Sequence, residues 1–395
     1  MVTEMTYALI TPYSLLKSRT GGIISRLLFL SNLEFVGARM YWPSDSFVDD
    51  YIETIKGRNL DAPTEKLFVD HINANFRRNN RLGISNRTML LLFRGDNAVE
   101  HFRKDVVGSF TAQVQGDTVR GTYGDYLVGK DGTVEFFEPA VLVGAEPDVT
   151  RKQLKLLADY AQSDSGIIEE AVKSRVGGDA ETTLVIIKPD AFGRRSVRPG
   201  NIIDVFSKTG LFIVGTKLLR LTVAQAEEFY GPLKDLFVRR LKGNVEKALI
   251  GRLQGVFGFN VSSEQYSAMA DILKEDNAAF EFDRIVEYMS GRSARTIRTS
   301  EERFAPGTAK ALALLYRGND AVNKIRERLG STDPTKAAEG TVRSDFGYDL
   351  MKNGAHASDS VQNAERERKI VGLWPGYEKP DVEQLIREYL STGQA

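Results

Sequence analysis

His356 is the side chain in this sequence best suited to act as a nucleophile, and it is one of only three histidines among 395 residues. It follows the turn Asn353-Gly-Ala and precedes Ser358-Asp-Ser, a pattern that can begin a helix. Arg343 lies upstream and Glu367 lies on the helix expected downstream. An imidazole close to hydroxyls, an amide, a guanidinium and a carboxylate is suited to handling phosphate groups.

Composition and charge restrict the class of protein. Lys plus Arg and Asp plus Glu number 53 each, so a formal net charge of zero gives no electrostatic support for binding nucleic acid or a membrane surface. The absence of cysteine excludes disulfides, thiolate zinc sites and cysteine nucleophiles, and it fits a reducing compartment. There is no signal-peptide pattern and no apolar run of the roughly 20 residues that a membrane helix needs. We therefore expect a cytoplasmic protein without membrane association.

The elements that must position His356 alternate between strands and helices. The expected strands cover residues 5–12, 33–40 and 88–93 in the first half, and 181–189, 211–219 and 311–316 in the second half. The expected helices cover 22–30 and 96–106, then 199–210 and 320–328. Thr222 and Gln225 form a capping-box pattern, which predicts that a helix begins there and reaches Tyr230.

The two halves of the chain repeat each other. Leu-Leu-Phe-Arg94-Gly-Asp-Asn-Ala-Val matches Leu-Leu-Tyr-Arg317-Gly-Asn-Asp-Ala-Val at an offset of 223 positions (317 − 94). A Thr-Val-Arg motif recurs at the same offset (343 − 120). Pro12 and Pro189 are only 177 positions apart (189 − 12), so the second copy has a net 46 extra residues (223 − 177). We place them at about 238–305, where two further helices are expected.

The order of elements predicts the fold class. Each copy has the order strand–helix–strand, then helix, strand, helix, strand, which is typical of a ferredoxin-like α+β sandwich with an antiparallel sheet covered on one face. We expect a first domain at 1–162 and a second domain at 181–395. A short linker is expected at 163–180, where Gly, Ser and Asp are frequent.

Five blocks of the second copy resemble nucleoside diphosphate kinases. They are, in order, Ile-Ile-Lys188-Pro-Asp, Glu-Glu-Phe-Tyr230, Arg326-Glu-Arg-Leu-Gly-Ser-Thr332-Asp-Pro, Gly-Thr-Val-Arg343-Ser-Asp-Phe-Gly, and Asn353-Gly-Ala-His356-Ala-Ser358-Asp-Ser with Ala-Glu-Arg-Glu367. The resemblance runs from Thr183 to about Leu373, interrupted by the insertion. Separated blocks in the right order are more specific than one histidine motif.

The resemblance implies a ping-pong phosphotransfer. His356 would attack the γ-phosphate of a nucleoside triphosphate and form a phosphohistidine, from which a nucleoside diphosphate would take the phosphoryl group. Histidine suits this step because an unperturbed imidazole is largely neutral at physiological pH. Glu367 would accept the imidazole N–H and fix the tautomer, and Ser358 belongs to the same catalytic group by this resemblance.

The other residues carried over from the resemblance would bind the nucleotide. They are Lys188, which also counts as catalytic, Tyr230, Phe237, Arg326, Thr332, Arg343 and Asn353. Phe237 is the candidate for stacking on the base, although its spacing from Tyr230 differs by one from the family pattern. Mg²⁺ is the implied cofactor, bridging the phosphates and held mostly by the nucleotide, so no metal ligand is assigned. The implied partners are ATP, other nucleoside di- and triphosphates, and further copies of the chain in a homo-oligomer.

The first copy looks like a degenerate version of the second. Its lysine position is Thr11, and the region equivalent to the histidine, from Pro139 to Pro147, contains no histidine. Arg120 is retained, but we expect this copy to be non-catalytic. The second copy itself departs from the family pattern at Ala357, where a glycine is usual, and at the insertion near the expected nucleotide entrance.

Two other functions stay open from the sequence. A protein-histidine phosphotransferase would pass the phosphoryl group to a protein, and a non-catalytic scaffold would bind nucleotide without forming a phosphoenzyme. The run from Gly124 to Asp131 resembles a P-loop but ends in Asp where Ser or Thr should bind Mg²⁺, and we interpret it as coincidence. The basic run from Asn75 to Arg81 is interpreted as a solvated surface.

Overall fold

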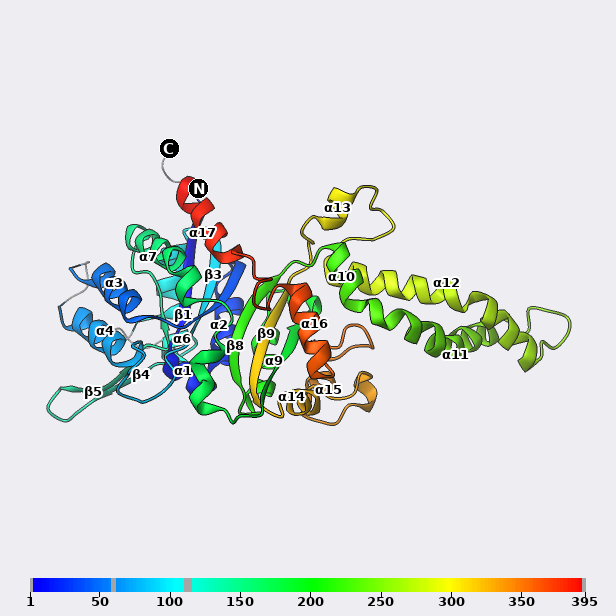
Figure 1. Cartoon of the computed structure of the whole chain (residues 1–395), viewed down its shortest axis with the longest axis horizontal. Helices are drawn as coiled ribbons and strands as arrows, with labels where there is room; N and C mark the ends of the chain where they lie inside the picture. Colours follow the sequence, from blue (N-terminus) through cyan, green and yellow to red (C-terminus); the bar gives the residue numbers. More distant parts are fainter. Residues whose placement is uncertain (1–2, 58–61, 110–115, 393–395) are drawn as a thin grey trace. The chain divides into compact units, whose positions relative to one another are not determined.

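The computed structural model describes residues 3–57, 62–109 and 116–392, without the side chains of 235, 236 and 239–241. The backbone divides into a first unit, residues Met1–Leu218 and Leu312–Ala395, and a second unit, residues Leu219–Ala311. The first unit contains two four-stranded sheets, and the second unit is built from helices (Figure 1).

The first sheet has the strand order β2-β3-β1-β6, with antiparallel pairs throughout. Its strands are β1 (Thr3–Ile10), β2 (Glu34–Tyr41), β3 (Thr88–Asp96) and β6 (Val141–Leu142). Its helices are α1 (Pro12–Leu16), α2 (Thr20–Leu30), α3 (Asp45–Ile55), α4 (Ala62–Asn75), α5 (Ala98–His101), the π-helical turn η1 (Phe102–Val107), α6 (Val119–Tyr123) and α7 (Pro147–Asp159). A two-stranded ribbon, β4 (Asp125–Val128) and β5 (Val134–Glu138), is separate from the sheet.

The second sheet repeats the first, with the order β10-β7-β9-β8. Its strands are β7 (Ala180–Ile187), β8 (Phe212–Leu219), β9 (Ala311–Asn319) and β10 (Ala355–Ala357). Its helical segments are η3 (Pro189–Ala191), α9 (Arg198–Ser207), α14 (Ala321–Leu329), η5 (Pro334–Lys336), α15 (Val342–Phe346) and α16 (Val361–Val371). Two tandem ferredoxin-like sandwiches are therefore present, as predicted.

The strand register confirms the repeat residue by residue. Thr3 lies opposite Asp96 in the first sheet, and Ala180 lies opposite Asn319 in the second sheet. These pairs differ by the two offsets found in the sequence, 177 (180 − 3) and 223 (319 − 96). A carboxylate near the start of each central strand also accepts an equivalent backbone N–H, from Val99 to Glu4 and from Val322 to Glu181.

The two halves of the first unit pack through equivalent helices. α2 and α9 lie against each other, and a Cβ built on Gly21 would come within 2.3 Å of the Gly200 carbonyl oxygen. The hydroxyl of Ser25 also donates to the carbonyl oxygen of Val197 at 2.8 Å. The backbones approach so closely because Gly21 and Gly200, which face each other across the crossing, carry no Cβ.

The segment expected as a linker, 163–180, makes specific contacts with both sheets. It contains the end of α8 (Ala161–Asp164) and the 3₁₀ turn η2 (Glu169–Arg175). The N–H of Gly166 donates to Met40 in β2, and the N–H of Ile168 donates to Val214 in β8. The connection is therefore part of the packing between the two halves.

The last helix, α17 (Asp381–Thr392), packs on the first half of the chain. Val382 and Ile386 are buried in the same apolar cluster as Phe47 and Tyr51 of α3. The predicted domain at 181–395 thus contains a helix whose apolar face completes the core of the other copy. An amphipathic helix after the last motif block gives no sign of which core it will enter.

The second unit is built from helical segments, whereas two further helices were expected at about 238–305. The helical segments are α10 (Val223–Tyr230), the 3₁₀ turn η4 (Gly231–Leu233), α11 (Lys234–Leu253), α12 (Ser263–Ser290) and α13 (Ser300–Phe304). Thr222 caps α10 through the predicted capping box with Gln225. α11 and α12 form an antiparallel hairpin (Figure 1). Of the helices in the described ranges, not one combines the length and apolar content needed to cross a bilayer.

Two expectations for the first copy were wrong. Sequence patterning assigned no element to the charged stretch before residue 82, but α4 occupies 62–75. The run from Asn75 to Arg81 is also not simply a solvated surface, because Asn75, Phe76 and Asn80 are buried. The Asn80 side chain donates to the carbonyl oxygen of Ile84 at 2.7 Å, so it holds the following loop in place.

We predict that Gly21→Ala lowers the free energy of unfolding by about 1–3 kcal/mol, because the added methyl group must force α2 and α9 apart. The matched control is Gly251→Ala, in α11, where an added Cβ has nothing within 4 Å. That variant should be neutral or stabilising by up to about 1 kcal/mol. Chemical denaturation of both full-length variants measures the difference, and equal effects would contradict the packing described here.

Candidate active site

Lys188 is the central cation of the second copy, and its side chain is buried. It follows β7 directly, and its backbone N–H donates to the carbonyl oxygen of Gly354 at 3.0 Å. Its ammonium group donates to Asn353 Oδ1 at 2.7 Å and to the carbonyl oxygen of Met351 at 3.0 Å. Burial first, and the charge of Arg343 next, lower the pKa of Lys188 to about 7.

The segment between α14 and β10, which includes η5 and α15, contains three further predicted residues that lie close together, Thr332, Arg343 and Asn353. The guanidinium of Arg343 donates to Thr332 Oγ1 at 3.2 Å and to the carbonyl oxygen of Gly330 at 3.0 Å. The amide of Asn353 donates to the carbonyl oxygen of Thr332 at 3.1 Å. Asn353 therefore links Lys188 to the Thr332 turn, so that an ammonium, a guanidinium and a hydroxyl are held in one network.

His356 lies in the short strand β10, opposite Ile186 of β7. Its Nε2 is 2.8 Å from Glu367 Oε2, on α16, and the Ser358 hydroxyl donates to the same carboxylate oxygen at 2.6 Å. The His356 side chain is 20% exposed, whereas Glu367 and Ser358 are buried. The imidazole is thus oriented from its protected side and can be reached from outside.

The charge on Glu367 fixes the tautomer of His356. Burial alone would raise the pKa of the Glu367 carboxyl, but the interactions with His356 and Ser358 outweigh it, and the pKa is lowered. An ionised carboxylate only accepts hydrogen bonds, so Nε2 must carry the proton of a neutral imidazole. Nδ1 is then the unprotonated nitrogen, which has the lone pair that a nucleophile needs.

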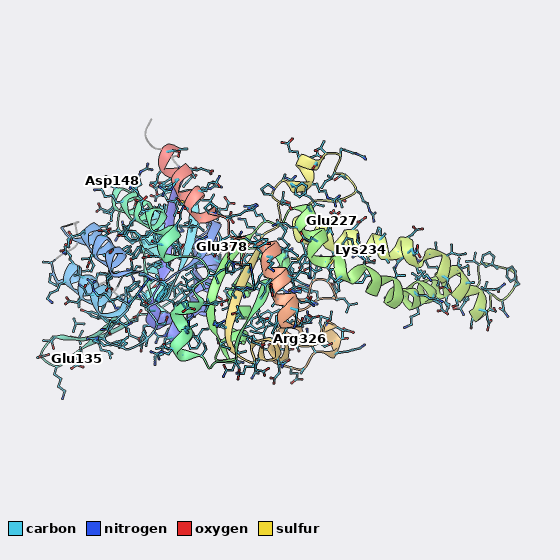
Figure 2. All side chains as sticks on the ribbon, viewed as in Figure 1. Glu135, Asp148, Glu227, Lys234, Arg326 and Glu378 are labelled. Atoms are coloured by element: carbon cyan, nitrogen blue, oxygen red, sulfur yellow. The ribbon has the colours of Figure 1, made fainter. Side chains whose placement is uncertain are left out.

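The other predicted residues lie in two places. Arg326 projects from α14 and is exposed (Figure 2). Its helix, α14, packs against β10 and β7, and the charge of Arg326 contributes to the lowered pKa of Asp359, after the hydrogen bond from Asn363. Tyr230 and Phe237 belong to the second unit, and the site described here is built from residues of the first unit alone.

The same positions in the first copy carry different chemistry. The N–H of Thr11 donates to Ala140, as that of Lys188 donates to Gly354, so Thr11 occupies the lysine position. Val141 lies opposite Ile10 as Ala355 lies opposite Ile187, which puts Leu142 at the position of His356. The sequence comparison assigned the lysine position to Thr11, and for the histidine it gave only a region, Pro139 to Pro147, which includes Leu142.

The helix at the counterpart of Glu367 carries a neutral amide. α7 and α16 begin 214 positions apart (361 − 147), and the same offset relates Gln153 to Glu367. Gln153 Oε1 accepts a hydrogen bond from the hydroxyl of Tyr7 at 2.7 Å. A leucine and an amide therefore replace the histidine and the carboxylate.

The retained Arg120 of the first copy is covered by α4. Its guanidinium lies 5.4 Å from the centre of the Phe68 ring, and the ring of Phe137 packs edge-on against Phe68. Glu138 is buried beside Thr11, whose hydroxyl donates to it at 2.5 Å, and burial raises the pKa of Glu138 to about 7. The space above the counterpart of Arg343 is therefore filled by the chain's own aromatic side chains.

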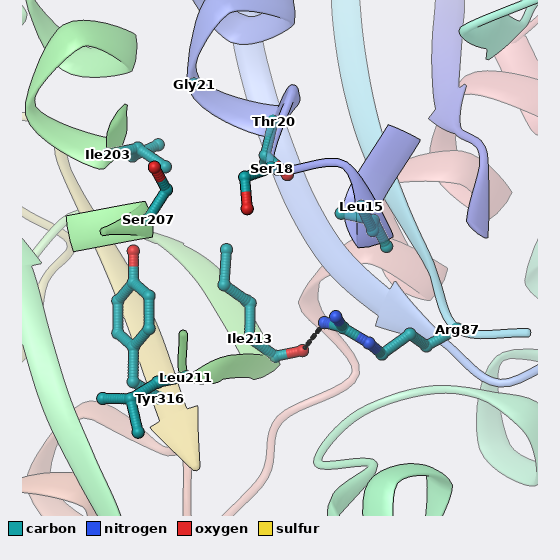
Figure 3. Close-up of a pocket in the computed structure, with 10 residues that line it drawn as sticks. All are labelled: Leu15, Ser18, Thr20, Gly21, Arg87, Ile203, Ser207, Leu211, Ile213 and Tyr316. Atoms are coloured by element: carbon teal, nitrogen blue, oxygen red, sulfur yellow. Dashed lines mark hydrogen bonds between the residues drawn. The ribbon is translucent and has the colours of Figure 1, made fainter. Parts of the chain in front are cut away.

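A small cavity of about 30 Å³ lies between the two halves rather than at His356 (Figure 3). It is lined by Leu15, Ser18, Thr20, Gly21 and Arg87 from the first half and by Ile203, Ser207, Leu211, Ile213 and Tyr316 from the second half. The buried guanidinium of Arg87 donates to the carbonyl oxygen of Ile213 at 2.7 Å. The cavity has room for about one water molecule and contains none of the predicted site residues.

The two sheets define tandem ferredoxin-like sandwiches, of which the second carries a cationic network beside an oriented histidine. Residues 181–250 and 304–371 match the family model described as nucleoside diphosphate kinase. The second half of the chain is therefore similar to nucleoside diphosphate kinases over these two segments. The gap between the matched segments falls within the predicted insertion.

Solved structures of two such enzymes are similar to this chain. The nucleoside diphosphate kinase from Encephalitozoon cuniculi is 26% identical, and the match covers 48% of this chain and 87% of that chain, with a TM-score of 0.30. The nucleoside diphosphate kinase from Aquifex aeolicus is 27% identical, with 49% and 94% of the two chains covered and a TM-score of 0.30.

Sequence reasoning missed two contributors to the site. The carbonyl oxygen of Met351 binds the Lys188 ammonium, and a backbone acceptor carries no signal in the sequence. The guanidinium of Arg198 contacts the loops on both sides of Lys188, although it lies outside every motif block. The sequence shows an arginine at position 198, but no motif or spacing distinguishes it from the other arginines.

We predict that the ring nitrogens of His356 give the NMR signature of an Nε2–H tautomer near neutral pH. Glu367→Gln should mix the two tautomers, because a neutral amide can either donate or accept. His71→Asn and His101→Asn assign the signals, since the chain has only three histidines. An Nδ1–H signature in the wild-type chain would contradict the geometry.

Proposed function

We propose that the chain is a nucleoside diphosphate kinase that transfers the γ-phosphate of a nucleoside triphosphate to a nucleoside diphosphate through a phosphohistidine at His356. The observation that carries this proposal is the contact between His356 and Glu367, at 2.8 Å, in the same copy as the buried Lys188. A nucleophile that is oriented from behind and partly exposed in front is suited to attack on a bound phosphate.

The first half-reaction follows from the tautomer. The lone pair on Nδ1 of His356 attacks the γ-phosphorus, a nitrogen–phosphorus bond forms, and the bond to the β–γ bridging oxygen breaks. The nucleoside diphosphate leaves with that electron pair. Glu367 keeps the Nε2 proton in place and stabilises the positive charge that develops on the ring. The second half-reaction is the reverse, with a different nucleoside diphosphate as acceptor.

The cationic network has the chemistry for binding the phosphates. Phosphoryl transfer depends mainly on positioning and on neutralising the charge of the phosphate oxygens. Lys188, Arg343, Thr332 and Asn353 supply donors from one connected network, and Arg326 adds an exposed guanidinium on α14, which packs against β10. By family resemblance, Tyr230 and Phe237 would contact the phosphates and the base.

Mg²⁺ is proposed to arrive with the nucleotide. Within residues 3–57, 62–109 and 116–392, no group of three or more His, Asp or Glu side chains is arranged to hold a metal ion. The donors around Lys188 and Arg343 are suited to phosphate oxygens rather than to a cation. When bound to the nucleotide, Mg²⁺ would neutralise part of the phosphate charge. The homo-oligomer and the cytoplasmic location stay predictions.

Transfer of the phosphoryl group to a protein is the rival reaction, and it would use the same phosphoenzyme. We predict that the chain incubated with γ-labelled ATP and Mg²⁺ acquires acid-labile label, which a chase with GDP moves to GTP. His356→Ala should remove the label, and Glu367→Gln should slow its formation by about 10²-fold or more.

His101→Ala is the matched control, because His101 lies in the other copy and should leave the reaction unchanged. Label that forms but resists GDP would favour a protein acceptor. ATP binding without any label would leave a non-catalytic scaffold as the function.

We predict that nucleotide binding weakens as the pH rises above about 7. In the free protein the pKa of Lys188 is lowered to about 7. The charged form that attracts phosphate is therefore complete below this pH and is lost above it, by up to about tenfold in affinity per pH unit. Calorimetric titration with ADP between about pH 6 and 9 should show this loss in the wild type. The same titration of Lys188→Met gives the pH dependence of affinity that comes from ADP itself, which is subtracted from that of the wild type. If affinity changes with pH in the same way in both proteins, the prediction is contradicted.

A further inference from the structure

Arg198 is the first residue of α9, and its guanidinium joins three segments of the second copy. It donates to Asp190 Oδ2 at 2.9 Å and to the carbonyl oxygen of Phe346. The ring of Tyr348 lies 5.0 Å from the guanidinium carbon. The side chains of Arg198 and Asp190 are only 17% and 6% exposed, so solvent screens this ion pair weakly.

The contacts of Arg198 fall next to the residues of the cationic network. Asp190 is two residues beyond Lys188, on the 3₁₀ turn that follows β7. Phe346 is three residues beyond Arg343, at the end of α15. Lys188 and Asn353 tie the same two segments together at a second point. Two cross-links fix the spacing of two loops far better than one, because a single contact leaves a hinge.

We propose that Arg198 is a positioning residue, which holds the loop after β7 and the loop between α15 and β10 at the spacing that a nucleotide's phosphates require. This inference rests on the proposed function, because it names a support for the same site. Arginine suits the task because its planar fork can serve a carboxylate and a carbonyl at the same time, whereas a lysine ammonium is a point charge.

Arg198 also controls the electrostatic surroundings of Lys188. The charged groups that act on Lys188 are Arg343, which disfavours its protonation, and Asp190 and Asp349, which favour it. Arg198 offsets the charge of Asp190 through their ion pair. Removing the guanidinium should strengthen the effect of the Asp190 charge on Lys188, and removing the carboxylate should weaken it.

The test is calorimetric titration of the full chain with ADP, for the wild type and for Arg198→Ala, Arg198→Lys and Asp190→Asn. We expect Arg198→Ala to weaken binding by about tenfold or more, because the loops lose one of their two cross-links. The ADP affinity of Arg198→Lys should lie between those of the wild type and Arg198→Ala. A lysine keeps the ion pair with Asp190 but cannot donate to the carboxylate and the carbonyl oxygen at the same time. Arg195→Ala is the matched control, because that exposed arginine contacts the ring of Phe29 in the first half, and it should bind as the wild type does.

The pH profile distinguishes positioning at this site from a general loss of structure. The pH at which ADP affinity begins to fall should move upward in Arg198→Ala and downward in Asp190→Asn, whereas general loosening would move both in the same direction. Wild-type affinity in Arg198→Ala, or a shared direction of the two pH shifts, overturns the inference while the proposed function stands. A wild-type chain that does not bind ADP overturns both. If Arg198→Ala does not fold, the affinity of Arg198→Lys decides instead: weaker ADP binding than in the wild type is expected, and wild-type affinity overturns the inference.

Discussion

The ammonium group of Lys188 is buried, and a buried charge is stable only where oxygen atoms take the place of its water. Asn353 and Met351 supply those oxygens, and both come from the loop that leads into β10. The loop that precedes β10, the strand of His356, is therefore held in its conformation by its hydrogen bonds to the Lys188 ammonium. The lowered pKa of Lys188 shows that this solvation is incomplete, so the site favours an added anion.

The duplicated fold shows how little of a sandwich has to change for its site to be lost. Strand order, register and the carboxylate that caps the helix after the third strand of each sheet are the same in both copies. The differences at the site lie at the end of the first strand, at the start of the last strand, and on the helix that follows, where Gln153 stands at the position of Glu367. In the first copy, α4 and its Phe68 cover the retained Arg120, which puts an aromatic face where an anion would otherwise bind. That copy instead supplies packing surface, since α2 lies directly against α9.

The fold and most of the site could be predicted from the sequence, because strands, turns and motif blocks each have a recognisable periodic or local residue pattern. Buried strands ended by Pro12 and Pro189, and the Arg-Gly turns at Arg94 and Arg317, give the repeat its register. The motif blocks led to Lys188, Asn353, His356 and Glu367, which form two hydrogen-bonded pairs, Lys188 with Asn353 and His356 with Glu367. α4 was missed because its buried face is formed by His71, Ile72 and Asn75, two of them polar, so the apolar spacing of a helix is absent. The contacts of Arg198 with Asp190 and Phe346 depend on how two loops meet, which neither loop specifies alone.

The burial of Val382 and Ile386 among the side chains of α3 has a consequence for synthesis of the chain. The first copy emerges from the ribosome long before the last helix has been synthesised, and domains usually fold as they emerge. Here the first copy must wait with part of its apolar core exposed until residues 381–392 have been made. The synthesis of residues 381–392, rather than the end of the first copy, is thus the step at which that core becomes complete.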